Sequence, residues 1–441
     1  MKRELLDVRT NRRRLLKAGG ALGLGLGLAG RWLAPALAQE VTLTYPSWML
    51  GEAGVGDYWM ESVATFEEQN PGVKLETTLI PSNEYEDKTF TQIAGGSTPD
   101  IYPVFTNMVP RLIAEDLLEP LDDYLAEVDW LKNELPALQV AQREGKTYGV
   151  VLTASPQGLL YNQELLDAAG VEGIPTTPDE FFAAVQAVKE KTGEWGYAFT
   201  MDTSEEQSAY ISTMHWVLGF GSDWAAADAT PTANDPKTVE AMEWQMKFIE
   251  SGAVPVGMPT LDTRNLFKDG KVAFMIDGPW VMTLVKNENP DLYPSIGYDA
   301  PPTPTHAAIT GGAFFTIPRA SANKEIAWAY INMINQEEWQ RRWLEDLVQI
   351  PGQNIPASEE FLAENPWVAN MIEIAAKYQA GFGYSPPSPV LAVNANEFRK
   401  IVVGEVAQIW NGSKSVTDGL NDLQQALVDW EAGMGIVPGE A

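Results

Sequence analysis

The chain has 441 residues, more than a single hydrophobic core accommodates, so two or three domains are expected. It carries 30 basic and 60 acidic side chains and no cysteine. The resulting net charge of −30 argues against nucleic acid and anionic membrane surfaces as partners, and the lack of cysteine excludes disulfides, thiolate metal sites, thiol nucleophiles and cysteine-linked lipid anchors.

The first 38 residues differ from the rest in charge. They hold eight basic and two acidic side chains, a net of +6, whereas the remaining 403 residues carry −36. The basic run 12–17 precedes an apolar, glycine-rich stretch, and Ala36-Leu37-Ala38 precedes Gln39. This layout is typical of a secretory signal, and the adjacent arginines resemble the twin-arginine type. We therefore expect Tat-dependent export of a periplasmic protein without a lipid anchor; a general secretory signal is the alternative.

Strands and helices alternate through the mature chain. The predicted order is strand 41–45, helix 58–69, strand 73–77, helix 84–94 and strand 100–104. A second unit follows, with strands 159–161 and 196–200, helix 178–191 between them, a buried strand at 272–276, and helical segments at 322–346, 397–410 and 416–430. Such alternation is typical of a sheet with flanking helices, and thus of the α/β class.

Two α/β units predict two lobes rather than one oversized sheet. The proline-rich runs 301–304 and 386–389 are stiff extended segments suited to crossing between lobes, and a third crossing is expected near 152–156. The predicted N-terminal lobe comprises 39–153 with 307–384, and the C-terminal lobe comprises 154–306 with 385–441.

Several strings occur in the same order as in a known family. They are Phe66-Glu-Glu-Gln-Asn-Pro-Gly-Val-Lys74, Gly96-Ser-Thr-Pro-Asp100-Ile, Leu160-Tyr-Asn-Gln-Glu-Leu-Leu166, Pro175-Thr-Thr-Pro-Asp-Glu-Phe181, Phe267-Lys-Asp-Gly-Lys-Val-Ala-Phe274, Asp277-Gly-Pro-Trp280, Ile309-Thr-Gly-Gly312 and Asn323-Lys-Glu-Ile-Ala327. As a set they resemble the bacterial extracellular solute-binding proteins of the sugar-binding, maltose-binding-protein-like class. These proteins are the diffusible receptors of ATP-driven importers.

The resemblance implies a two-lobed periplasmic binding protein fold. Each lobe is then a sheet flanked by helices, and a multi-strand hinge joins the two lobes. The lobes close around a ligand that is held between them. It further implies a monomer that binds a small carbohydrate or polyol and delivers it to the permease subunits of an ABC importer in the inner membrane.

A sugar site needs aromatic rings for the C–H faces of the sugar and polar groups for its hydroxyls. Trp280, just after a predicted strand, is the first aromatic candidate, with packing between the lobes as its alternative role. The resemblance also places Trp48 and Glu52 at the edge of the cleft. Tyr384, just before the second proline-rich run, is a further aromatic candidate.

The remaining candidates are polar or small. They are Asn107, Ser155, Gln157, Asp202, Gly311 and Gly312. Asn107 and Ser155 stand where the related maltose receptors carry carboxylates, which argues against maltose itself. Solvation is the alternative for Asp202, and a hinge role is the alternative for the two glycines.

Enzyme motifs are not found. His215 and His306 lie far apart and fit no metal-ligand spacing, and there is no nucleophile elbow, P-loop or Ser-x-x-Lys motif. We therefore predict no catalytic residue, metal or cofactor. The alternative is a secreted glycoside hydrolase with paired carboxylates, but in so acidic a chain the abundance of carboxylates does not discriminate.

Overall fold

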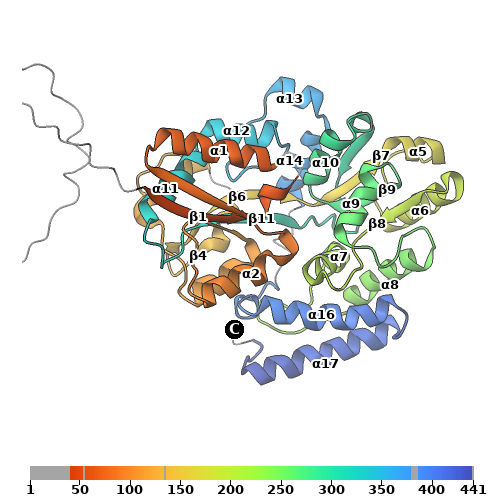
Figure 1. The fold of residues 1–441 in the computed structure, drawn as a ribbon. Coiled ribbons are helices and arrows are strands. Elements are labelled where there is room, and N and C mark those ends of the chain that lie inside the picture. Colours follow the sequence, from red (N-terminus) through yellow and green to blue (C-terminus); the bar gives the residue numbers. More distant parts are fainter. Residues whose placement is uncertain (1–39, 53–54, 134–135, 379–385, 440–441) are drawn as a thin grey trace, which may run out of the picture. The chain divides into compact units, whose positions relative to one another are not determined.

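The computed structural model describes residues 40–52, 55–133, 136–378 and 386–439 (Figure 1). The predicted export signal and Tyr384 therefore lie outside the described residues. Residues 41–441 form one unit by their contacts, and all that follows concerns this unit. None of its described helices is both long enough and apolar enough to cross a bilayer.

The N-terminal strands form as predicted. Strand β1 (Val41–Ser47) runs parallel to β2 (Val73–Leu79), with helix α1 (Val55–Gln69) between them in the chain, and α2 (Ser82–Ala94) leads to β3 (Tyr102–Phe105). The Asp100 carboxylate ties β1 to the start of β3, since it accepts a hydrogen bond from the Thr44 amide at 3.0 Å. A three-stranded sheet of order β3-β11-β6 continues this lobe, with β11 (Thr310–Thr316) antiparallel to both β3 and β6 (Gly149–Pro156).

A second sheet has the order β10-β7-β9-β8. Its strands are β7 (Gly158–Asn162), β8 (Trp195–Ala198), β9 (Val272–Asp277) and β10 (Ile296–Asp299). Only β8 and β9 are parallel; β7 pairs antiparallel with both β9 and β10. The two strands predicted from 159–161 and 196–200 are therefore separated by β9, which the order of elements in the chain does not reveal.

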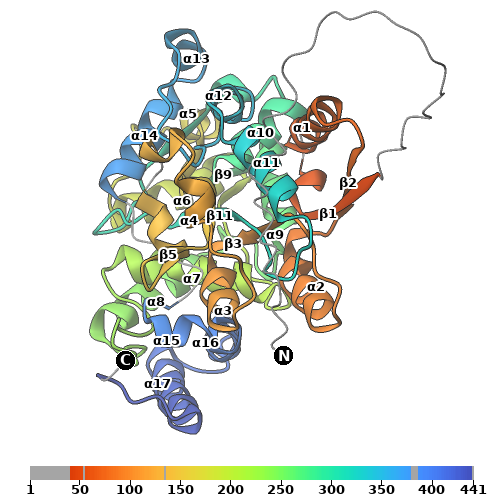
Figure 2. The same cartoon turned by 90° about the vertical axis from the view of Figure 1, so that its left-hand side faces the viewer.

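The remaining helices, a short hairpin and several 3-10 turns surround these sheets (Figures 1 and 2). They are α3 (Val109–Ala114), α4 (Asp122–Leu125), the hairpin β4 (Gln142–Arg143) and β5 (Lys146–Thr147), α5 (Gln163–Ala169), α6 (Pro178–Thr192), α7 (Glu206–Gly219), α8 (Pro236–Glu250), α9 (Thr260–Lys268), α10 (Trp280–Glu288), α11 (Lys324–Ile334), α12 (Glu337–Glu345), α13 (Glu359–Glu364), α14 (Trp367–Lys377), α15 (Pro389–Ala392), α16 (Ala395–Trp410) and α17 (Val416–Met434), with short 3-10 turns at η2 (Met49–Gly51), η3 (Thr106–Met108), η4 (Trp130–Asn133), η5 (Pro136–Ala141) and η6 (Tyr293–Ser295).

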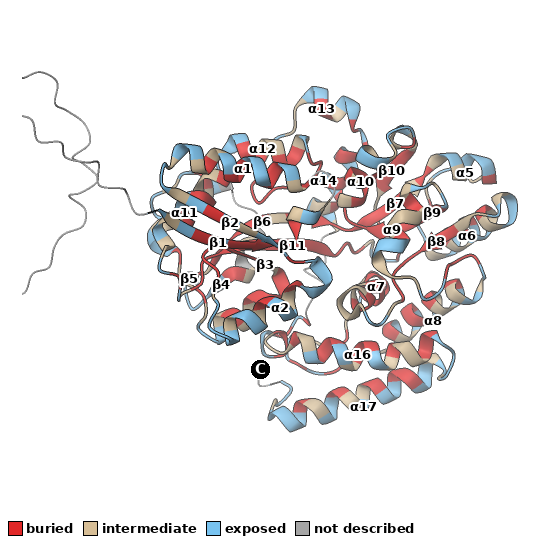
Figure 3. Ribbon diagram, viewed as in Figure 1, coloured by how far each residue is buried: buried red, intermediate tan, exposed pale blue. Residues whose placement is uncertain are grey.

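Separate cores show that the fold has two lobes. One buried cluster packs β1, β3, β6 and β11 against α1, α11 and α12, and Trp59 and Tyr330 are among its fully buried members. Two further clusters cover the second sheet, one on α6, α7, α8, α16 and α17 and one on α10 and α14. Figure 3 shows strands of both sheets in the colour of buried residues. The chain passes from one sheet to the other directly between β6 and β7, and again between β10 and β11.

The lobe boundaries remain a prediction, and the cores motivate one refinement. Val348, Phe361, Trp367 and Met371 are buried in the cluster that covers β9 and β10, although the sequence assigned them to the N-terminal lobe. We propose that the last crossing between the lobes lies near residue 348 rather than 384. The amphipathic pattern of α14 shows that one face is buried, but it does not show which sheet covers that face.

A buried carboxyl on α17 leads to a first prediction. Glu431 is 1% exposed, its two carboxylate oxygens have no hydrogen-bond partner in the described part of the chain, and burial raises its pKa to about 7 from 4.5. Its folded state therefore binds the proton more tightly than its unfolded state, and stability falls as pH rises from about 4.5 through about 7. We expect Glu431→Gln to raise the free energy of unfolding by about 1–2 kcal/mol at pH 8, with little change at pH 4.5.

Urea denaturation at the two pH values measures this difference. Asp429→Asn is the matched control, because Asp429 lies on the same helix, is exposed and accepts a hydrogen bond from Gln425. An equal gain for Glu431→Gln at both pH values would show that ionisation of Glu431 is not the cause.

Candidate functional site

Polar side chains of the two lobes meet at two places. We call this region the interlobe site and define it by Glu52, Glu86 and Asn107 of the N-terminal lobe and Glu206, Arg264, Asp277, Trp280 and Arg399 of the C-terminal lobe. At one place Glu52 lies within range of the charges of Arg264 and Asp277, and at the other Glu86, Asn107 and Glu206 lie around Arg399.

Asp277 organises the C-terminal side of the interlobe site. It ends strand β9 and is 8% exposed. Its Oδ2 accepts a hydrogen bond from Arg264 Nε at 2.7 Å, and its Oδ1 accepts bonds from Arg264 Nη2 at 3.1 Å, the Gly278 amide at 2.7 Å and Trp280 Nε1 at 2.8 Å. The two-point contact with the guanidinium is the strong, geometrically specific form of an ion pair. One carboxylate thus fixes both a cation and an aromatic ring.

The string Asp277-Gly-Pro-Trp280 can now be explained residue by residue. A β-carbon at Gly278 would overlap the Trp280 ring, so only glycine lets the indole fold back over the chain. Pro279 caps the start of α10, where its missing amide hydrogen is not needed. Trp280 remains half-buried, and the Arg264 guanidinium carbon lies 5.6 Å from its ring centroid. The result is a fixed, partly accessible aromatic surface.

Glu52 faces this group from the other lobe. It follows the short η2 turn after β1 and is half-buried. Burial raises the pKa of Glu52 to about 7; the charge of Arg264 opposes this shift, and the charge of Asp277 adds to it. Glu52 therefore lies within range of the charges of Arg264 and Asp277. No hydrogen bond of its carboxylate to another described residue is found.

This environment predicts a pH-dependent arrangement of the lobes. A carboxyl with a pKa near 4.5 when solvated and about 7 when enclosed favours the closed lobes at low pH, and this preference is lost as pH rises through about 7. We expect the radius of gyration of the ligand-free protein in small-angle scattering to be larger at pH 8 than at pH 5.

Glu52→Gln should remove this difference, because the amide does not titrate. Asp57→Asn, at an exposed position in the first turn of α1, is the control and should retain it. A pH-dependent radius that persists in Glu52→Gln would assign the effect to another group.

The second meeting point involves Arg399 of α16. Its Nε donates to Glu206 Oε1 at 2.9 Å and its Nη2 donates to Glu86 Oε2 at 3.1 Å, so it bridges helices α7 and α2. Arg399 is 1% exposed. The same Glu86 oxygen accepts a hydrogen bond from Asn107 Nδ2 at 2.8 Å, while Asn107 Oδ1 is buried without a partner among the described residues. Asn107 therefore lies at the boundary between the lobes.

The other predicted residues have different surroundings. Trp48 is buried, and its ring centroid lies 4.0 Å from that of Phe105 and 4.8 Å from that of Tyr85. Asp202 is half-buried and caps its own turn through hydrogen bonds to the amide and hydroxyl of Ser204. In this arrangement Trp48 contributes mainly to the N-terminal core, and Asp202 mainly to a local turn.

Four predicted residues belong to the crossing strands. Ser155 pairs with Gly311 and Ala154 with Gly312 across β6 and β11, and the Ser155 hydroxyl accepts a hydrogen bond from the Ile350 amide at 3.1 Å. Gln157 links β6 to β7, and its backbone N–H donates to the Ile309 carbonyl at 2.7 Å. These residues hold the crossing together, so their contact with a ligand remains a prediction.

Four residues of the interlobe site were missed as candidates in the sequence, namely Glu86, Glu206, Arg264 and Arg399, and Asp277 was noted only as part of a string. A signal was present for Arg399, which shares a helical face with the apolar Ala395, Val402 and Val406. A charged side chain on such a face needs a buried partner. A weaker form of the same signal was present for Glu86, which Phe90 and Ile93 follow at helical spacing, and for Arg264, which Phe267 follows one turn later.

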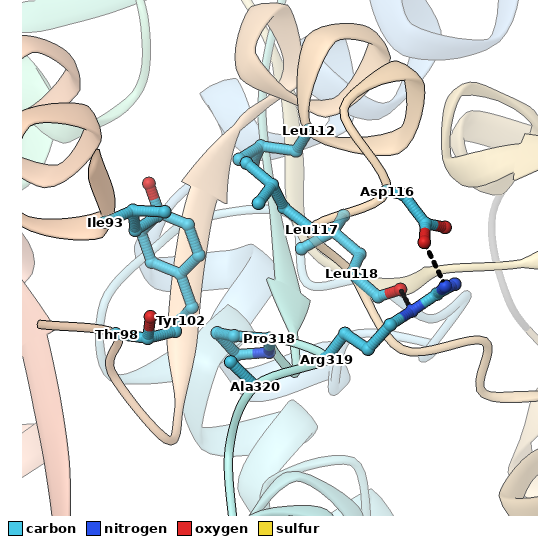
Figure 4. Close-up of a pocket in the computed structure, with 10 residues that line it drawn as sticks. All are labelled: Ile93, Thr98, Tyr102, Leu112, Asp116, Leu117, Leu118, Pro318, Arg319 and Ala320. Atoms are coloured by element: carbon cyan, nitrogen blue, oxygen red, sulfur yellow. Dashed lines mark hydrogen bonds and ion pairs between the residues drawn. The ribbon is translucent and has the colours of Figure 1, made fainter. Parts of the chain in front are cut away.

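Two observations concern sites of other kinds. Among the residues that the structure describes, no cluster of three or more potential metal-ligating side chains is found. An apolar cavity of about 220 Å³ lies within the N-terminal lobe, lined by residues that include Ile93, Tyr102 and Leu117, with the Arg319–Asp116 ion pair at its edge (Figure 4). It shares no lining residue with the interlobe site.

Comparisons with known proteins agree with this architecture. A family model described as bacterial extracellular solute-binding protein matches residues 61–376. A putative binding protein of Brucella abortus is 29% identical over 356 residues, which cover 79% of this chain and 84% of the relative.

Solved structures show the same fold at low sequence identity. The GacH receptor of Streptomyces glaucescens, studied unliganded and in complex with acarbose, superposes with a TM-score of 0.78 at 23% identity and covers 88% of this chain and 97% of that one. A solute-binding protein from Thermotoga lettingae, bound with α-D-tagatose, gives a TM-score of 0.78 at 21% identity, with 88% and 98% coverage.

Proposed function

Because the chain belongs to the bacterial extracellular solute-binding proteins, we propose that it is a receptor for a small carbohydrate or polyol. The ligand binds between the lobes, the lobes close around it, and the complex delivers it to the permease of an ABC importer. The observation that carries this proposal is the Trp280 ring, which a hydrogen bond to Asp277 fixes on one lobe, while Glu52 of the other lobe lies within range of the Asp277 charge.

The chemistry of the interlobe site supports this ligand class. Trp280 offers an aromatic face for the C–H side of a sugar ring, and Glu52 offers an acceptor for hydroxyl groups. The two similar structures were solved with acarbose and with α-D-tagatose, ligands of different size on one fold. Fold alone therefore does not set ligand size. Asn107 and Ser155 in place of carboxylates argue against maltose.

In this proposal no bond is made or broken. A glycoside hydrolase needs two carboxyl groups that act on the glycosidic bond, one as acid and one as nucleophile or base. At the interlobe site Asp277 is already engaged by four hydrogen bonds, and Arg399 pairs with both Glu86 and Glu206. The hydrolase alternative also has no support from the relatives.

Export and location are part of the proposal. The arginine-rich start of the chain supports Tat-dependent export, and Ala36-Leu37-Ala38 supports cleavage before Gln39. In this proposal the mature receptor is a monomer free in the periplasm, and the lack of cysteine argues against a lipid anchor. The intact mass of the exported protein measures the cleavage site. A mature protein that begins far from Gln39 would contradict the proposed signal.

A thermal-shift screen on the purified mature protein tests the ligand class. The panel contains sugars, polyols, sugar phosphates, oligopeptides and divalent metal ions. A ligand at about 100 times its dissociation constant adds about 2.7 kcal/mol of stability, enough to raise the midpoint by a few degrees. We expect stabilisation by a carbohydrate or polyol; stabilisation by peptides or metal ions alone would contradict the proposal.

A further inference from the structure

The Glu86–Arg399 ion pair joins two parts of the molecule that pack separately. Glu86 lies on α2, where its neighbour Tyr85 is buried in the core of the N-terminal lobe. Arg399 lies on α16, where Phe398 and Val402 are buried in the core of the C-terminal lobe. Helices α3 and α15 also meet here, as Figure 2 shows. The 3.1 Å contact between Glu86 Oε2 and Arg399 Nη2 therefore exists only while the lobes are together.

Each half of the pair keeps a partner when the lobes separate. Arg399 retains Glu206 through Nε and Asn396 through Nη2, at 2.9 and 3.2 Å. Glu86 retains the Asn107 amide at 2.8 Å, and its carboxylate can be hydrated. Neither side is then left as a buried, unpaired charge, which is the state that makes broken ion pairs strongly unfavourable. The contact is thus suited to repeated formation and loss.

Glu86 also determines which end of the Asn107 amide is turned toward it. The Glu86 carboxylate accepts only, so it requires the donor end of the Asn107 amide and turns Oδ1 away from itself. Oδ1 is buried without a partner among the described residues. A buried amide oxygen without a donor is unfavourable, and a hydroxyl of a bound ligand would satisfy it.

We propose that the Glu86–Arg399 ion pair, which we call the latch, stabilises the closed lobes. In this proposal Glu86 is a positioning residue that also orients Asn107 to accept a hydrogen bond from the ligand. The proposed stabilisation by the latch does not depend on the identity of the ligand, whereas the role of Asn107 rests on the proposed function. Because only the closed fraction of the receptor binds with full affinity, a weaker latch raises the apparent dissociation constant by the factor by which that fraction falls.

The chain is well suited to a direct test because it contains no cysteine. Single cysteines at Ala64 on α1 and Glu190 on α6, both exposed and on different lobes, allow spin labels to report the distance between the lobes. The test variant is Glu86→Gln, which removes the charge that Arg399 binds. The matched control is Glu84→Gln, the same change on the same helix, at an exposed residue whose partner is Lys88 one turn away.

In ligand-free protein, we expect Glu86→Gln to move the distance distribution toward the longer, open population and Glu84→Gln to leave it unchanged. For a carbohydrate that stabilises the unmodified protein, we expect Glu86→Gln to weaken affinity about 3- to 10-fold. The thermal midpoint without ligand should stay close to that of the control, which a general loss of packing would not allow. Asn107→Asp, which carries no amide donor for Glu86, should likewise weaken affinity.

An unchanged distance distribution in Glu86→Gln would overturn the latch. An opened distribution with unaltered affinity for a bound carbohydrate would overturn the link between closure and binding. If Glu86→Gln opens the lobes but no carbohydrate binds the unmodified protein, the latch stands and the proposed function fails.

Discussion

Replacing Asp277 by alanine is expected to remove most carbohydrate binding and to lower the free energy of unfolding by about 3 kcal/mol. The substitution deletes the acceptor of four hydrogen bonds at once, including the two-point contact with the half-buried Arg264. It also removes the hydrogen bond from Trp280 Nε1 to Asp277 Oδ1, which fixes the ring. Calorimetric titration and urea denaturation measure the two effects, and we expect affinity to fall on the order of 100-fold.

Asp277→Asn separates charge from geometry. Its amide oxygen can still accept from Trp280 Nε1 and the Gly278 amide, but the pair with Arg264 loses its charge. We therefore expect the losses in stability and affinity to lie between those of the unmodified protein and Asp277→Ala. If Asp277→Ala bound and unfolded like the unmodified protein, Asp277 would not organise the interlobe site.

Replacing Trp280 by alanine is expected to weaken carbohydrate binding about 30-fold or more while leaving the fold intact. The ring is half-buried at the start of α10 and packs against one of the core clusters without being a buried member of it, so the fold should tolerate its loss. Aromatic anchors at binding sites carry about 2 kcal/mol or more each, which corresponds to about 30-fold in affinity. Isothermal titration with a carbohydrate identified in the screen measures the change.

Trp244→Ala is the matched control. Trp244 is also half-buried, lies on α8 of the same lobe, and contacts Phe182 and Lys247 outside the interlobe site. It should leave affinity unchanged even if stability falls. Equal affinity of Trp280→Ala and the unmodified protein would exclude the ring from the site, whereas a partial effect of Trp280→Phe would support stacking.

Most secondary structure followed from the sequence because its signals are local. The capping residue Thr177 accepts a hydrogen bond from the Glu180 amide, and the predicted helix 178–191 is confirmed as Pro178–Thr192. The expected strand 272–276 is confirmed as Val272–Asp277. A continuous apolar run is typical of a strand whose two faces are both buried, as they are here. Where hydrophobic period and caps agree, tertiary contacts are not needed to predict an element.

Pairing between elements was not predictable in the same way. Strand β9 lies between β7 and β8, and α14 covers the second sheet rather than the first, because long-range packing decides both. The site shows the same limit. Trp280 and Glu52 were predicted individually, but their relation through Arg264 and Asp277 depends on how the two lobes meet. Arg399 and Glu86 lie 313 positions apart in the chain, a separation over which no local pattern acts.

The most direct test of the central claim is an isothermal titration of the mature protein with the carbohydrate or polyol that stabilises it best, followed by mass analysis of the ligand released on denaturation. Receptor function predicts saturable binding of one ligand per chain, loss of that binding in Asp277→Ala, and recovery of the ligand with its mass unchanged. Absence of binding by any carbohydrate or polyol, or recovery of a cleaved product, would contradict it.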